Sequence, residues 1–316
     1  MNKMIAVVGP TASGKSGLAV EICKRFGGEV VSCDSMQLYK KMNIGTAKPS
    51  DEEMQGIAHH LIDFLEFGRD YSVSDYVMDA EKCCEKLFSR GVLPVFCGGT
   101  GLYISSFLSG IEFGEYENNP DIRKELESFL EEKGRDALYE ELVEVDKIAA
   151  DAIDKNNVKR VLRALEVYRT TGVTISEWNR RSKLNAKKKD CLVIGLDYCD
   201  RELLYARIDK RVDIMLDMGL VDEARGLYEN GLMNFKCASQ AIAYKEFVPY
   251  FEGADTLENC VETLKKNSRR YAKRQLTWFR RNPEIKWIFR DNLKDGELEK
   301  EAFKLVELYL SEESNG

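Results

Sequence analysis

Residues 4–16 read MIAVVGPTASGKS, and this stretch decides the fold class. The apolar run 4–8 predicts a short buried strand, residues 9–16 match the pattern G-x-x-x-x-G-K-[ST], and residues 15–25 have the character of a helix. A strand, a glycine-rich turn and a helix in this order are the context that a phosphate-binding loop requires. We therefore predict a P-loop here rather than an ordinary glycine turn.

The chemistry of this loop follows from its residue types. Glycines let successive backbone N–H groups converge on phosphate oxygens, and the helix N-terminus adds a partial positive charge. The Lys15 ammonium neutralises phosphates, and the Ser16 hydroxyl can ligate Mg²⁺. The predicted phosphate-binding residues are Gly9, Pro10, Thr11, Ala12, Ser13, Gly14, Lys15 and Ser16.

Strands and helices alternate along most of the remaining chain. Further strands are expected at 29–33, 92–97 and 191–198, with an edge strand possible at 286–289. Helices are expected at 74–89, 201–216, 221–229, 257–281 and 297–310. This alternation is typical of an α/β fold, and with the P-loop it predicts an NTPase-like parallel sheet flanked by helices.

One segment departs from this alternation. Residues 112–154 contain 15 acids and 5 bases, whereas residues 155–189 contain 11 bases and 2 acids. Both parts look helical, and the helix that contains VKRVLRALEVYRTTG is expected to end at a Gly172 cap. We therefore predict a P-loop catalytic core, residues 1–111 and 190–316, interrupted by an all-helical insertion at 112–189.

Composition narrows the class of protein. A net charge of −7 disfavours unspecific nucleic-acid binding but leaves a local basic face open. No stretch approaches the roughly 18–20 apolar residues that span a bilayer, and the N-terminus passes at once into the P-loop, so we expect neither a signal peptide nor a membrane partner. The nine cysteines lack C-x-x-C spacing, which favours reduced thiols and a cytoplasmic protein without a zinc site. His59 and His60 are adjacent and are expected to be structural rather than a metal pair.

Another set of polar residues, DSMQLY at 34–39, follows the predicted strand 29–33. Open α/β sheets bind ligands beyond the carboxyl ends of their strands, so Asp34 could hold Mg²⁺, bond a substrate amine or accept its proton. Asp34 could also simply cap the next turn. Gln37 carries donors and acceptors that could read the edge of a base.

Six motifs occur in order along the chain: GPTASGKS, CDSMQLYKKMNIGTAKP, HHLID, CGGTGLY, RVLRALEVYRTTG and YAKRQLTWFRR. Together they resemble the bacterial tRNA dimethylallyltransferases, also called isopentenyl-tRNA transferases, over residues 7–281. The resemblance implies transfer of a dimethylallyl group from dimethylallyl pyrophosphate to tRNA, with release of pyrophosphate. The acceptor is the exocyclic amine of the adenosine immediately 3′ of the anticodon.

The resemblance also implies roles for single residues. The P-loop with Lys15 holds the pyrophosphate, with Mg²⁺ near Ser16. Asp34 contacts the attacking amine and is the base, and Thr100 approaches oxygens of the pyrophosphate. The residues that match family segments touching tRNA are Asp34, Ser35, Met36, Gln37, Arg123, Lys159, Arg160, Val161, Leu162, Arg163, Ser239 and Tyr244.

The chain departs from the family pattern at one position. Many members read IGYKE where this chain has alanine, at Ala243. Alanine adopts positive φ less freely than glycine, so the local backbone geometry could differ from that of relatives.

An RNA partner is also indicated by the predicted helix 257–281. Its second half, KKNSRRYAKRQLTWFRR at 265–281, carries eight bases and no acid, with Tyr271, Trp278 and Phe279 interleaved. Bases bind phosphates and exposed aromatics stack on splayed bases. For Trp278 and Phe279 we favour the alternative that they belong to the buried stripe of the helix. With the basic segment 155–189, this helix could form two walls of an RNA cleft.

Two other classes stay open on the sequence. A P-loop alone also suits a nucleotide-binding protein such as an ATP-binding small-molecule kinase, although the Asp-Glu strand end of ATPases and the basic lid of nucleoside kinases are missing. Alkyl transfer itself needs no nucleotide. A non-catalytic RNA-binding factor is the second alternative, and intact Lys15, Ser16, Asp34 and Thr100 speak against it. We expect a monomer.

Overall fold

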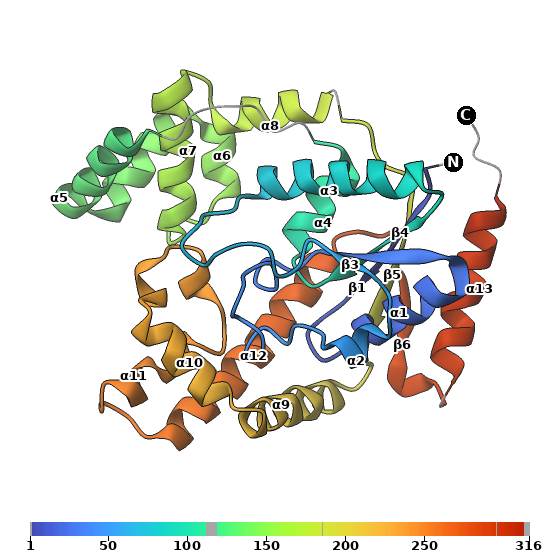
Figure 1. Ribbon diagram of the computed structural model, residues 1–316. Coiled ribbons are helices and arrows are strands. Elements are labelled where there is room, and N and C mark those ends of the chain that lie inside the picture. The colour runs from blue at the N-terminus through green and yellow to red at the C-terminus, as the bar shows by residue number, and fades with distance from the viewer. Residues whose placement is uncertain (1, 112–118, 185, 295, 313–316) are drawn as a thin grey trace. The chain divides into compact units, whose positions relative to one another are not determined.

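Six strands form one sheet in the order β3-β2-β4-β1-β5-β6, and every pair is parallel (Figure 1). The computed structural model describes residues 2–111, 119–184, 186–294 and 296–312. The strands are β1 (Met4–Val8), β2 (Gly28–Ser32), β3 (His59–His60), β4 (Leu93–Gly98), β5 (Cys191–Asp197) and β6 (Lys286–Phe289). The predicted P-loop α/β class is confirmed, and β6 is the expected edge strand. Strand β3 was not predicted, because two residues are too few to show an alternating pattern.

The chain divides into two compact units. One comprises Met1–Leu108 with Lys189–Gly316 and contains the sheet; the other is Ser109–Lys188. The α-helices that accompany the sheet are α1 (Lys15–Phe26), α2 (Asp51–Met54), α3 (Val73–Ser89), α4 (Gly101–Ser109), α9 (Arg201–Asp217), α10 (Leu220–Glu229), α11 (Val248–Phe251), α12 (Leu257–Phe279) and α13 (Glu297–Ser311). The described residues of this unit also form four short 3-10 helices, η1 (Leu232–Asn234), η2 (Ala238–Gln240), η3 (Lys245–Phe247) and η4 (Arg290–Asn292).

The register of the central strands brings three loops to one edge. All five residues of β1 are buried, and Val8 at its end lies opposite Gly98 of β4 and Gly195 of β5. In β2, Ser32 lies opposite Cys97 of β4. Because these strands are parallel, the segments that follow β1, β2 and β4 leave the sheet at the same edge.

Helices cover both faces of the sheet, as the alternating pattern requires (Figure 1). On one face, α1 and α13 bury an apolar cluster together with strand residues such as Ile5 and Val7. On the other face, α4 places the ring of Phe107 4.7 Å from that of Phe96 in β4. Also on this face, the hydroxyl of Tyr76 in α3 donates to the backbone of β2. The site edge is therefore held between two apolar layers.

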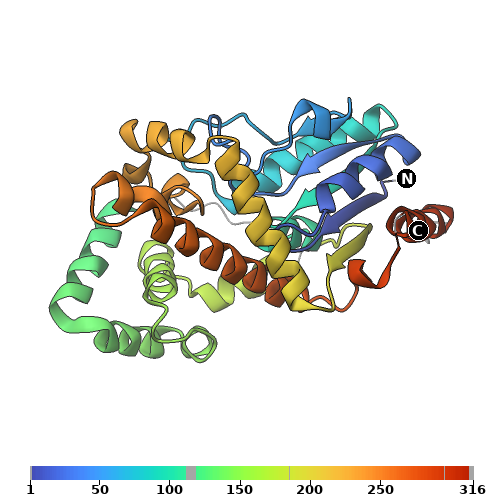
Figure 2. The ribbon, with the colours of Figure 1, turned by 90° about the horizontal axis from the view of Figure 1, so that it is seen from below.

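Beside the site edge, α9 lies against α12 (Figure 2). Ion pairs reinforce the contact, since Arg269 of α12 bonds Asp209 of α9 at 2.6 Å and Lys265 bonds Asp213 at 2.7 Å. The contact fixes α12 along its basic half.

All the regular secondary structure described in the second unit is helical. Its helices are α5 (Pro120–Val145), α6 (Lys147–Ala152), α7 (Val158–Thr171) and α8 (Ile175–Leu184). Leu138 and Leu165 are among its buried residues, and α5 is kinked at Gly134, whose φ is 82°. Gly172 caps α7 with φ 70°, as predicted. The predicted start of the insertion falls on 112–118, which lie outside the described residues.

Within the described parts of the chain, no helix combines the length and apolar character needed to cross a bilayer.

Ala243 adopts a backbone conformation that alanine disfavours. Its φ is 90°, its side chain is 2% exposed, and its N–H donates to Glu246 Oε2 at 2.9 Å. A non-glycine residue at such φ is strained by roughly 1–3 kcal/mol. This is the position at which sequence analysis noted alanine in place of a family glycine.

We expect Ala243→Gly to raise the free energy of unfolding by about 1 kcal/mol, because relief of strain exceeds the added entropy of the unfolded chain. Urea denaturation measures the change. Ala241→Gly is the matched control: Ala241 is buried nearby at φ −58°, so glycine there should destabilise by roughly 0.5–1 kcal/mol. A loss of stability in Ala243→Gly would contradict the strain.

Candidate functional site

A cavity of about 340 Å³ lies where β1, β2 and β4 end. Its polar side is formed by Thr11, Lys15, Ser16, Asp34, Ser35, Gln37, Thr46, Arg211, Gln240, Lys245, Ser268, Tyr271, Arg274 and Gln275. Its apolar and small residues are Met36, Gly45, Ala47, Cys97, Gly98, Ile208, Val212, Met215, Ala241, Ile242, Ala243 and Leu264. The volume suits a small organic ligand.

The P-loop conformation explains its two glycines. A Cβ on Gly9, whose φ is 152°, would lie 2.5 Å from the carbonyl oxygen of Leu196, and one on Gly14, with φ 86°, would lie 1.8 Å from Arg290 Nη1. Arg290 in turn donates to the carbonyl of Ser13 at 3.0 Å. Helix α1 has no side-chain cap, so the N–H groups of its first turn are available to an anion.

Two desolvated cations face the cavity. Burial lowers the pKa of the Lys15 ammonium, and the neighbouring Arg211 guanidinium lowers it further. Burial also lowers the pKa of Arg211. Among the described lining residues, Lys15, Arg211, Lys245 and Arg274 contribute positive charge and Asp34 is the single carboxylate. Lys245 and Arg274 are exposed, whereas Lys15 and Arg211 are desolvated. This surplus of positive charge favours a multiply charged anion.

Asp34 both caps a turn and faces the cavity, so the two interpretations of this residue are compatible. Its Oδ1 accepts the N–H of Met36 at 3.0 Å, as in an Asx turn. Its Oδ2 has no hydrogen-bond donor among the described residues. That oxygen is the atom of the carboxylate available to a ligand.

Thr100 supports this segment from the loop after β4. Its hydroxyl oxygen accepts the N–H of Ser35 at 2.9 Å and the hydroxyl itself donates to Ser35 Oγ at 3.2 Å. Thr100 borders the cavity through Ser35 rather than lining it. Its predicted contact with pyrophosphate stays a prediction.

Gln275 connects two of the three loops and was not among the predicted site residues. Its Oε1 accepts the N–H of Thr11 in the P-loop at 2.9 Å, while its Nε2 donates to the carbonyl of Gly99 at 3.0 Å. The residue is buried, at 5% exposure. No local pattern distinguishes this glutamine from other polar residues of a basic helix. Its position on the buried face of α12 was the available signal.

Other predicted tRNA contacts lie in different surroundings. Ser239 adjoins the lining residue Gln240. Tyr244 is 1% exposed, and its hydroxyl donates to Glu223 at 2.9 Å. Its ring is therefore covered by protein rather than presented to solvent.

The predicted contacts of the second unit fall on α5 and α7. Arg123 bonds Glu127 at 2.6 Å. Val161 and Leu162 are buried in the core of this unit, so their side chains serve packing. The side chains of this stretch that a polyanion can reach are Lys159, Arg160 and Arg163.

The eight bases of residues 265–281 fall into two sets. Three of them are paired with acids within the protein, namely Lys265, Arg269 and Arg280. The other five have no acidic partner within 4 Å among the described residues: Lys266, Arg270, Lys273, Arg274 and Arg281. Phe279 is buried as expected, whereas Tyr271 lines the cavity. The free basic surface is thus smaller than the sequence suggested.

A metal ion in this cavity would need oxygen ligands from its substrate. The described residues contain no group of three or more His, Cys, Asp or Glu that could hold a metal. Ser16 and Asp34 line the same cavity, and Mg²⁺ commonly takes one or two protein oxygens together with phosphate oxygens and water. The donor set therefore fits Mg²⁺ bound through a phosphorylated ligand.

Comparison with known proteins places this geometry in a family. The model of the IPP transferase family matches residues 37–282. The chain belongs to the IPP transferase family. The predicted family resemblance is confirmed.

Relatives in this family align over nearly the whole chain. The chain is 46% identical over 293 residues to a tRNA dimethylallyltransferase of Caldanaerobacter subterraneus, covering 92% of this chain and 93% of the relative. It is 44% identical over 311 residues to that of Acetivibrio thermocellus, covering 98% of each.

Two solved structures share the fold. The tRNA isopentenylpyrophosphate transferase of Bacillus halodurans is 41% identical, with a TM-score of 0.73, and the match covers 98% of this chain and 97% of that one. A eukaryotic dimethylallyltransferase acting on tRNA is 30% identical, with a TM-score of 0.84 and coverage of 98% and 79%.

We expect Lys15→Met to stabilise the protein at pH 7 while weakening inorganic pyrophosphate binding by roughly tenfold to a hundredfold, because a charge-assisted contact is lost. The pKa of Lys15 is lower in the folded than in the unfolded chain, so the unfolded chain binds its proton more tightly. Lys15 therefore makes the free energy of unfolding rise with pH between its pKa in the folded chain and its pKa in the unfolded chain. The Lys15→Met variant should lack this rise.

Calorimetric titration and urea denaturation across pH measure these effects. Lys24→Met is the control, because Lys24 lies on the same helix at the surface, where it pairs with Glu21; both quantities should change little. Destabilisation of Lys15→Met with unchanged pyrophosphate affinity would contradict the assignment.

Proposed function

We propose that this protein transfers a dimethylallyl group from dimethylallyl pyrophosphate to the exocyclic amine of the adenosine immediately 3′ of the anticodon in tRNA, releasing pyrophosphate. The observation that carries the proposal is one cavity with two kinds of wall. Lys15 and Arg211 provide desolvated positive charge, whereas residues such as Ile208 and Met215 provide apolar surface. A short prenyl chain on a pyrophosphate has this same division.

The chemistry is governed by the leaving group. The amine of adenine is a weak nucleophile because its lone pair is delocalised into the ring, so cleavage of the carbon–oxygen bond must be assisted from the pyrophosphate. Preorganised N–H groups of the P-loop and the Lys15 ammonium stabilise the charge that grows there. As the new carbon–nitrogen bond forms, the amine loses a proton, and Asp34 Oδ2 is the base that accepts it in this proposal.

Mg²⁺ belongs to the proposal as the cofactor. When bound beside Ser16 through phosphate oxygens, it would supply further positive charge to the departing pyrophosphate. We also propose a cytoplasmic monomer, consistent with nine free cysteines. ATP binding at the P-loop is not required, because no phosphoryl group is transferred.

The direct test is incubation of the purified protein with Mg²⁺, labelled dimethylallyl pyrophosphate and unmodified tRNA, with and without ATP. Label on adenosine that does not depend on ATP supports the proposal. No label, together with ATP hydrolysis or a phosphorylated product, would make the protein a kinase or NTPase. Tight tRNA binding with neither reaction would favour the non-catalytic RNA-binding factor.

Asp34→Asn should lower single-turnover transfer by at least about a hundredfold, a typical magnitude for loss of a general base. Binding of tRNA should survive, because the amide still accepts the N–H of Met36. Rapid-quench measurement with saturating tRNA and donor provides the rate. An unchanged rate would remove Asp34 from the mechanism.

tRNA binding should weaken steeply with salt. Lys266, Arg270 and Lys273 are exposed and recur at helical spacing on α12. If the five unpaired bases each neutralise one phosphate, the slope of log affinity against log salt is about −3.5 to −4.5.

Replacing Lys266, Arg270 and Lys273 by alanine should make this slope shallower by about 2 to 3. Lys265→Ala is the matched control, because Lys265 pairs with Asp213, and it should leave the slope near the wild-type value. A flat salt response in the wild-type protein would contradict an RNA surface on α12.

A further inference from the structure

Residues 43–47, in the loop between β2 and α2, form part of the cavity wall. Gly45, Thr46 and Ala47 line the cavity. The loop is folded on itself, since the Thr46 hydroxyl donates to the carbonyl of Met42 at 2.6 Å and the N–H of Ala47 donates to the carbonyl of Ile44 at 2.9 Å. Its position therefore depends on what holds its outer side.

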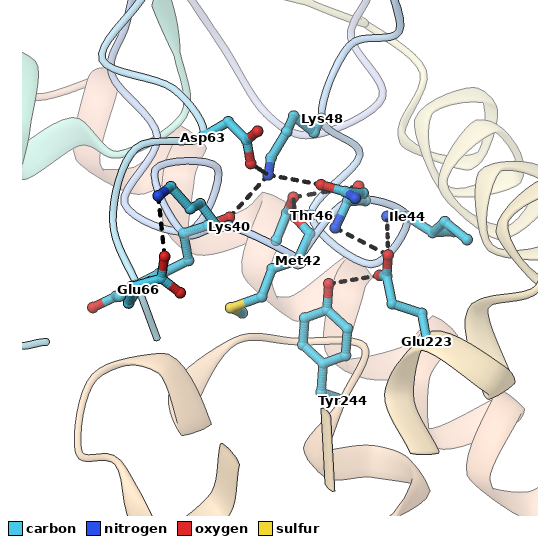
Figure 3. A network of polar contacts seen from close by, with 11 residues as sticks. Lys40, Met42, Ile44, Thr46, Lys48, Asp63, Glu66, Glu223 and Tyr244 are labelled. Atoms are coloured by element: carbon cyan, nitrogen blue, oxygen red, sulfur yellow. Dashed lines mark hydrogen bonds and ion pairs between the residues drawn. The ribbon is translucent and has the colours of Figure 1, made fainter. Parts of the chain in front are cut away.

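One carboxylate on α10 holds that outer side. Glu223 Oε2 accepts the N–H groups of Asn43 and Ile44, each at 3.0 Å, and its Oε1 accepts the N–H of Gly45 at 2.9 Å. The Tyr244 hydroxyl donates to the same Oε1 at 2.9 Å. Figure 3 shows Ile44 and Tyr244 converging on Glu223. Hydrogen bonds to a charged acceptor are the strong class, and four donors converge on this one.

Tyr244 also sets how closely the loop approaches. A Cβ on Gly45 would lie 2.6 Å from Cζ of the Tyr244 ring, so the ring fits directly against a residue without a side chain. The loop, Glu223 and Tyr244 therefore form one fixed unit, which we call the Glu223 clamp.

The loop in turn holds the side chain of Gln37. Gln37 Nε2 lies 3.1 Å from the carbonyl oxygen of Thr46 and 3.0 Å from that of Ala47. Because both neighbours are carbonyl oxygens, which only accept, the Gln37 atom between them must be the amide nitrogen. Both hydrogens of that nitrogen are then used. The remaining polar atom of this cavity-lining side chain is Oε1, an acceptor.

We propose that Glu223 is a positioning residue: through the backbone of residues 43–47 it fixes Gln37 so that the cavity receives a hydrogen-bond acceptor rather than a donor. The inference rests on the proposed function. It predicts selection of a base that carries an amine, because an adenine N–H can donate to Gln37 Oε1 whereas a carbonyl at the same ring position would face another acceptor.

Binding measurements without prenyl donor test the inference apart from chemistry. Two tRNAs are compared, one with adenosine and one with inosine at the target position; inosine has a carbonyl where adenosine has the amine. We expect the wild-type protein to bind the adenosine form roughly tenfold more tightly. Glu223→Gln has nearly the same shape but cannot accept all four donors, so it should lose most of this ratio.

The matched control is a second tyrosine–glutamate pair in the same region. Tyr228 donates to Glu252 at 3.1 Å, and among the described residues Glu252 makes no hydrogen bond or ion pair with the loop at 43–47. Glu252→Gln should therefore retain the wild-type ratio. If Glu223→Gln does not fold, Tyr244→Phe removes one donor while keeping the ring, and should reduce the ratio by about twofold to threefold.

A double-mutant cycle separates positioning from a merely structural role. Gln37→Leu should abolish the contribution of Gln37 to the adenosine preference, and adding Glu223→Gln to it should change the ratio no further. Equal effects of Glu223→Gln in both backgrounds would overturn the inference, as would an unchanged ratio in Glu223→Gln alone. Failure of the wild-type protein to bind tRNA would instead contradict the proposed function.

Discussion

Because β1 pairs in parallel with β4 and β5, and β4 with β2, the P-loop, the Asp34 segment and the Thr100 segment all leave the sheet at one edge. The apolar layers on both faces keep that register, since a shift by one residue would exchange the side chains that pack against the two layers. Gln275 then joins the P-loop to the loop after β4 through two hydrogen bonds. The site is thus a consequence of sheet register, completed by one helix.

Without a bound ligand, the desolvated positive charges of the cavity reduce the stability of the folded chain. Lys15 and Arg211 are desolvated, and burial is the main reason that the pKa of each side chain lies below its ordinary value. The nearby Arg211 guanidinium lowers the pKa of Lys15 further. A pyrophosphate would relieve this cost, because it brings compensating charge to groups already in place. Lys15 therefore lowers the stability of the folded chain while it favours ligand binding, a trade-off that is common in functional sites.

The sequence predicted what is encoded locally. The P-loop, most strands and the longer helices follow from hydrophobic period, glycine position and capping, and the Gly172 cap was correct. Gln275 and Glu223 were missed, because their partners lie far away in sequence and are backbone groups. All the bases of α12 were predicted to belong to one RNA-binding surface, whereas Lys265 and Arg269 pair with acids on α9. Long-range pairing of this kind leaves no pattern in a single sequence.

The most direct test of the account is a crystal structure with an analogue of dimethylallyl pyrophosphate whose bridging oxygen is replaced by sulfur. The account predicts phosphate oxygens on the N–H groups of the P-loop and on Lys15. It places the prenyl chain against the apolar wall that includes Ile208 and Met215, with its reactive carbon facing Asp34. A ligand bound outside this cavity, or one with its prenyl chain directed away from Asp34, would contradict it.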